Sequence, residues 1–163
     1  MTAVFEEARV HVACGRLDEA LGALDRVLAA DPGQAEALLL KATVLLEKRQ
    51  DEAALELCRA AVASSPRSSE ALNGLARCLH AMARDEEGLA AAEAARALLG
   101  EGDNFRHAAP VYLSIVWCLR DLRRYREAVA MAEEGLLRCP DAVLAQWATV
   151  VEEELAESEQ DRC

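Results

Sequence analysis

The segment GRLDEALGALDRVLAADP, at residues 15–32, opens with a turn, continues with apolar residues at helical spacing and ends on a proline. A second segment, LRRYREAVAMAEEGLLRCP at residues 122–140, has the same order. Apolar side chains recurring three and four positions apart are the pattern of an amphipathic helix. A proline cannot continue the interior of such a helix. The two segments therefore predict the same helical unit at two places in the chain.

Columns of matching residues extend this unit into a repeat. Ala20, Ala54, Gly88 and Ala128 hold small side chains at steps of 34, 34 and 40 residues. Small residues suit positions where two antiparallel helices cross closely, because a longer side chain would push the backbones apart. Three more columns keep the same steps: Ala8, Ala42, Ala76 and Val116; Val4, Leu38, Leu72 and Tyr112; and His11, Leu45, Leu79 and Leu119. A fixed period of this length predicts an array of stacked helix pairs.

The period, the helix-turn-helix unit and the order of the columns resemble the tetratricopeptide repeat (TPR). The resemblance covers nearly the whole chain and implies an all-α, right-handed superhelix of four helix pairs plus a C-terminal amphipathic helix. We expect a single array with repeats at about 1–34, 35–68, 69–108 and 109–142, a terminal helix at about 142–157 and a frayed tail at 158–163. The longer third step predicts extra residues around 100–104, and Pro110 then either starts the next helix or kinks a longer one.

Composition and charge exclude several classes of function. The net charge is −11 and the isoelectric point is near 4.8, so nucleic acids and anionic membranes are unfavourable partners. No apolar run approaches the roughly eighteen residues of a membrane span. Residues 1–7 carry acids where a signal peptide would carry bases, so we expect a cytoplasmic protein. The six cysteines have no CxxC spacing and no histidine partner at ligand spacing, so we expect reduced thiols and neither metal nor cofactor.

No catalytic motif stands out in the chain. Phosphate-binding loops, dinucleotide-binding turns, nucleophile elbows and HExxH are all missing from the sequence. Cys118 with a distant histidine could be read as a nucleophile pair. However, Cys78 and Cys118 share a column that Val10 and Val44 fill in the first two repeats, which favours a packing role. We therefore expect a protein that is not an enzyme.

The first helices of a TPR array line its concave surface, and in that family this surface binds extended peptides or helices. The resemblance therefore implies a groove built from one face of each first helix. Segment 37–46 is apolar nearly all round, although a helix needs only one apolar stripe to pack, and exposed apolar residues usually mark a binding site. Trp and Arg are frequent anchors of interfaces. The candidate groove residues are Phe5, Arg9, Leu39, Leu40, Thr43, Leu46, Asn73, Arg77, His80, Leu113, Trp117 and Arg120.

The function predicted from these features is a protein-interaction module, either an adaptor or a chaperone-like protein. Its partner would be a peptide or helical segment, apolar with some acidic character. The paired Lys and Asn of chaperone-tail clamps are replaced, for example by Phe5 and Gly74, so an acidic chaperone tail is not the expected ligand. Three alternatives remain open: a homodimeric scaffold that uses the same apolar surface, a chaperone of the type III secretion kind, and an enzyme site grafted on the array. It also remains open whether the 100–108 loop or the last helix covers the groove leucines, and whether Trp117 is a core residue.

Overall fold

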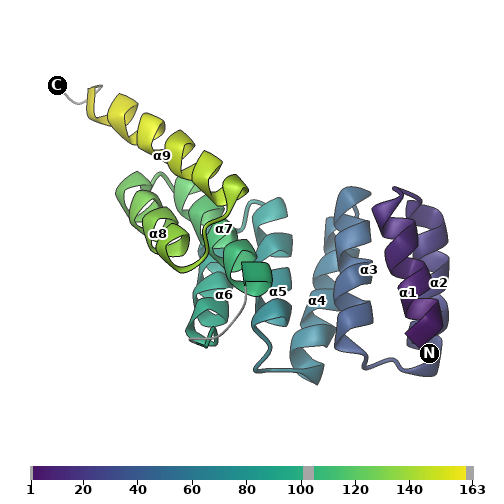
Figure 1. The fold of residues 1–163 in the computed structure, drawn as a ribbon. Coiled ribbons are helices and arrows are strands. Elements are labelled where there is room, and N and C mark those ends of the chain that lie inside the picture. The colour runs from purple at the N-terminus through teal and green to yellow at the C-terminus, as the bar shows by residue number, and fades with distance from the viewer. Residues whose placement is uncertain (1, 101–104, 161–163) are drawn as a thin grey trace.

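A computed structural model describes residues 2–100 and 105–160, and within these ranges every regular element is an α-helix. The helices are α1 (Thr2–Ala13), α2 (Leu17–Ala30), α3 (Ala35–Glu47), α4 (Asp51–Ser64), α5 (Ser69–Ala81), α6 (Asp85–Ala97), α7 (Phe105–Asp121), α8 (Tyr125–Arg138) and α9 (Ala142–Gln160). Consecutive helices pair and stack into an elongated array, with the two termini at opposite ends and α9 beside α7 and α8 (Figure 1).

The turns inside the four helix pairs share one backbone conformation. Gly15, Arg49, Ala83 and Arg123 have φ of 69°, 59°, 54° and 57°, and they follow one another at the same steps of 34, 34 and 40 residues. In each turn the next residue donates its N–H to the carbonyl five positions back, at 2.8–2.9 Å. This bond, with a left-handed residue before it, is the Schellman ending of a helix. The repeat is therefore present in the backbone as well as in the side chains.

The column of small residues is buried between helices. Ala20, Ala54 and Ala128 are fully buried. A Cβ atom added to Gly88 would lie 3.1 Å from the sulfur of Cys118 and 3.2 Å from the carbonyl oxygen of Ala76. Since such contacts are tighter than ordinary packing, α6 can approach α5 and α7 this closely only with glycine at this position.

Helix α7 begins at Phe105 and contains Pro110 in its interior. The expected boundary between repeats three and four, at 108/109, therefore falls inside a helix and is corrected. The added turn has a packing reason, because Ala108 and Ala109 enter the core and continue the apolar stripe of α7. Of the residues expected to form an insertion, 101–104 lie outside the described part of the chain.

Helix α9 is longer than expected. Asp141 caps it, since its carboxylate accepts the N–H groups of Val143 and Leu144 at 2.9 Å. The helix continues through Gln160, so the fraying expected at 158–160 is wrong. A pair between Arg126 and Glu159 at 2.7 Å ties this last turn to α8. Residues 161–163 lie outside the described residues.

The core is unevenly divided along the array. The largest apolar cluster joins α6, α7, α8 and α9 around the fully buried Tyr112, Ile115 and Leu144. Three smaller clusters serve α1 to α5. Among the helices of the described ranges, none is both long enough and apolar enough to cross a membrane.

Candidate functional site

A cleft of about 560 Å³ crosses α1, α3 and α5, the first helices of repeats one to three. It ends against Pro110 and Val111 of α7. Eight of the twelve residues predicted from the sequence line this cleft: Phe5, Arg9, Leu39, Leu40, Thr43, Leu46, Asn73 and Arg77. The stacking of equivalent helices therefore brings together residues up to 72 positions apart in the sequence.

The apolar wall of the cleft comes from α3. Leu38 and Leu45 are buried in the core, as their columns predict. Leu39, Leu40 and Leu46 pack against the core clusters with one side, remain partly exposed and line the cleft. The helix therefore has more apolar surface than its own packing uses.

The polar side of the cleft comes mainly from α5. Asn73 is 8% exposed, and its side-chain oxygen accepts no hydrogen bond from any residue that the structure describes. An acceptor left unpaired in a buried position costs on the order of 1–3 kcal/mol. Arg77 lies one turn further along and is half-buried, whereas Arg9 on α1 is exposed and pairs with Glu6 at 3.3 Å. The cleft thus offers an apolar wall, one buried acceptor and two cationic groups.

The other four predicted residues lie elsewhere. Leu113 is 9% exposed and belongs to the core cluster of α6 to α9, so its assignment to the groove is wrong. His80, Trp117 and Arg120 line a separate cavity of about 200 Å³, together with Asp121 and Trp147. The sequence predicts one groove over all four repeats, and the structure has two separate surfaces instead.

Helix α9 is the reason for this division. Arg120 donates to both carboxylate oxygens of Glu154 on α9, at 2.6–3.0 Å, so its charge is already compensated. Its guanidinium also lies 5.6 Å from the centre of the Trp147 ring. Trp147 in turn contacts Trp117 edge to face, with ring centres 6.0 Å apart. The last helix therefore covers the fourth repeat, which is one of the alternatives that the sequence leaves open.

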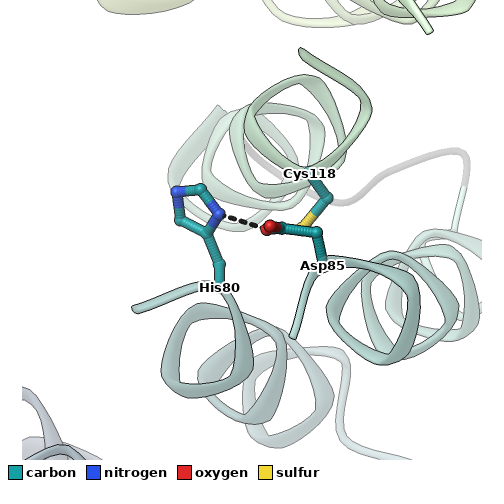
Figure 2. A group of neighbouring side chains, drawn as sticks. All are labelled: His80, Asp85 and Cys118. Carbon is teal, nitrogen blue, oxygen red and sulfur yellow. Dashed lines mark hydrogen bonds and ion pairs between the residues drawn. The ribbon is translucent and has the colours of Figure 1, made fainter. Parts of the chain in front are cut away.

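A cluster of three chemically different side chains lies where α5, α6 and α7 meet (Figure 2). His80 Nδ1 and Asp85 Oδ1 are 2.7 Å apart, and Cys118 approaches the same carboxylate from α7. Burial, with the nearby negative charges of Asp85 and Asp121, raises the pKa of the Cys118 thiol to about 12. The thiol therefore keeps its proton at neutral pH, which argues against its use as a nucleophile.

Sequence reasoning misses this cluster because its members are far apart and do not form a motif. His80 ends one helix, Asp85 starts the next, and Cys118 is 33 residues further on. The available signal is a change within one repeat column, where His80 replaces the Leu46 of the preceding repeat. The sequence instead favours a packing role for Cys118 and a place in the groove for His80.

Two further cysteines meet under the cleft. The sulfur atoms of Cys58 and Cys78 are 3.4 Å apart and buried. The hydrogen bond between them, together with burial, raises the pKa of Cys58. The five cysteines that the structure describes are all free thiols.

Comparisons with known proteins agree with this architecture. The family model for the tetratricopeptide repeat matches residues 5–69. A search of curated proteins finds no match. Among solved structures, TTC0263, a TPR protein of Thermus thermophilus, shares 22% identity with a TM-score of 0.82, over 94% of this chain and 82% of that one. The MamA protein shares 20% identity with a TM-score of 0.71, over 98% and 84%. PilF of Pseudomonas aeruginosa shares 20% identity with a TM-score of 0.81, over 96% and 69%. These likenesses confirm the predicted all-α superhelical fold.

Proposed function

We propose, from the premise that this chain is a tetratricopeptide repeat protein, that its cleft across α1, α3 and α5 holds an extended segment of a partner protein. The TPR fold by itself indicates a protein-interaction scaffold. The observation that supports the finer proposal is the pairing of unused apolar surface on α3 with the buried, unpartnered oxygen of Asn73.

The unpartnered oxygen favours an extended peptide over a helix. Asn73 offers an acceptor and therefore requires an N–H donor from its ligand. The N–H groups in the interior of a helix are already bonded to the helix's own carbonyls, whereas an extended peptide has backbone N–H groups to donate. An extended segment could place one N–H on Asn73 and its apolar side chains against Leu39, Leu40 and Leu46.

Charge limits the composition of that segment. Arg9 and Arg77 would attract a carboxylate, but Glu36 and Glu70 also line the cleft, and the whole protein carries a net charge of −11. A strongly acidic segment would therefore be repelled at long range. We expect a mainly apolar peptide with a single acidic residue, whose carboxylate pairs with Arg77.

Selection from a display library of random short peptides tests this proposal without knowledge of the natural partner. Peptides recovered on the wild type would be measured by fluorescence anisotropy against the wild type and two variants, Asn73→Ala and Arg77→Glu. Arg59→Glu is the matched control, because Arg59 is an exposed arginine on α4 that does not line the cleft. Circular dichroism would verify that each variant is folded.

We expect peptides rich in apolar residues with one acid, and at least about tenfold weaker binding to each cleft variant, equivalent to about 1.4 kcal/mol. The control should bind like the wild type. Equal binding to all four proteins, or a failure to select any peptide, would refute the proposal. A wild type that is dimeric by light scattering and becomes monomeric in Arg77→Glu would favour the self-associating scaffold instead.

A further inference from the structure

We propose that His80, Asp85 and Cys118, completed by Asp121, form a zinc-binding site at the junction of α5, α6 and α7. This site is separate from the cleft and does not depend on the function proposed for it. The first three residues each offer one ligand atom, and these atoms all lie within 4.8 Å of one another (Figure 2). A carboxylate oxygen of Asp121 lies 3.8 Å from Nδ1 of His80.

These distances are close to what a tetrahedral zinc ion needs. Bonds of about 2.0–2.3 Å to nitrogen, oxygen and sulfur place neighbouring ligand atoms about 3.3–3.8 Å apart. The Asp121–His80 distance already has this length, and the 2.7 Å between His80 and Asp85 must widen by less than about 1 Å to reach it. On binding, the Cys118 thiol proton would leave to solvent and the imidazole proton would lie on Nε2, which frees Nδ1 for the ion.

The mixture of donors selects the ion. An imidazole, a thiol and two carboxylates make up the set, and zinc accepts all three donor types. Calcium and magnesium favour sites built entirely from oxygen, so a thiol and an imidazole argue against both. The carboxylates make the set harder than the thiolate and thioether ligands that select copper(I).

The preceding repeat shows what the cluster would be without its histidine. One repeat earlier in the same columns, Asp51 corresponds to Asp85, Cys78 to Cys118, and Leu46 to His80. Asp51 lies near enough to Cys78 to act on its thiol, so the two repeats share this part of the arrangement. The later repeat adds the imidazole that brings a third donor. The chain therefore supplies its own matched control.

The surroundings give an ion access to the cluster. His80 and Asp121 line the small cavity with Trp117, Trp147 and Arg120, so an ion can approach from that side. The cationic Arg120 opposes this approach, but its charge is compensated by Glu154 and lies 3.4 Å from Asp121. The His80 ring stacks on Trp117 with centres 5.9 Å apart, which holds the imidazole in place. A bound ion would tie the turn between α5 and α6 to α7.

Cobalt(II) is the probe for this site, since it adopts the coordination of zinc and absorbs visible light. Untagged protein stripped with a chelator would be titrated with cobalt chloride in a Cys14→Ser/Cys163→Ser background, because Cys14 is exposed and would bind cobalt on its own. Three readouts are available: a thiolate-to-cobalt charge-transfer band, d–d bands of tetrahedral intensity, and quenching of fluorescence from Trp117 and Trp147, the chain's two tryptophans.

We expect saturation at one cobalt per chain, with all three signals reversed by an equal amount of zinc. Cys118→Ala should lose the charge-transfer band, and His80→Leu should weaken binding by at least about tenfold, whereas Cys78→Ala should bind like the background protein. Circular dichroism must show that the variants are folded. The proposal is overturned if the folded background protein gives no charge-transfer band, or if Cys118→Ala keeps it.

Discussion

The left-handed turn at Gly15 leads to a prediction in which one chemical change has opposite effects at two positions. Gly15 has φ of +69°, and no atom lies within 4 Å of a Cβ added there. Gly22 is an exposed residue inside α2, and a Cβ added there also meets nothing within 4 Å. Replacing either glycine by alanine therefore adds a methyl group in open space, so that only the backbone conformation distinguishes the two changes.

The expected magnitudes follow from that conformation. An L-residue in the left-handed region costs about 1–2 kcal/mol. Part of this is offset by about 0.4–1 kcal/mol, because alanine leaves the unfolded chain less freedom than glycine does. Gly15→Ala should therefore lower the free energy of unfolding by about 0.5–1 kcal/mol. Gly22→Ala should raise it by about 0.8–1 kcal/mol, which is the helix preference of alanine over glycine.

Urea denaturation followed by circular dichroism measures both values. The two variants should differ by about 1.5–2 kcal/mol with equal slopes against urea, since neither change alters the surface that unfolding exposes. If Gly15→Ala were neutral or stabilising, the Schellman turn would not be present in solution. If the two variants changed stability in the same direction, the argument from backbone conformation would fail.

Two further predictions test the packing. Ala54→Leu should lower the free energy of unfolding by about 1–3 kcal/mol through overpacking, and an unchanged urea midpoint would mean that the column of small residues does not lie at a helix crossing. Cys14 is exposed, whereas burial raises the pKa of the Cys139 thiol, whose hydrogen the carbonyl of Gly135 accepts. Iodoacetamide at neutral pH should therefore modify Cys14 in the folded protein and Cys139 only in urea, as measured by peptide mass spectrometry, and equal rates would contradict the burial of Cys139.

Much of the fold could be predicted because repetition supplies the same evidence several times. The columns through Ala20 and His11 each hold a consistent residue type at equal steps, so helix pairing follows even where one repeat departs from the pattern. The terminal helix could be predicted from its apolar stripe and from Asp141. Its length could not, because the residues from Glu157 to Gln160 are polar and the pair between Arg126 and Glu159 accounts for their order.

The site was less predictable because the columns imply the same neighbours for every repeat. In repeats one to three the inner helix face lines the cleft, as predicted for Leu39 and Asn73. In repeat four the extra helix α9 lies on that face, so Arg120 pairs with Glu154 and Leu113 is in the core. The cluster of His80, Asp85 and Cys118 depends on three helices meeting, which no single stretch of sequence contains.

The uneven core has a consequence for how the protein opens. Repeat arrays unfold in segments whose stability depends on each unit and on its immediate neighbours. The large cluster around Tyr112 stabilises α6 to α9, while α1 to α5 rely on smaller clusters. The cleft is thus built almost entirely on the half that opens first, where amide hydrogens exchange soonest. A ligand that bridges α1, α3 and α5 would supply contacts that this half lacks, so that occupancy and local order rise together.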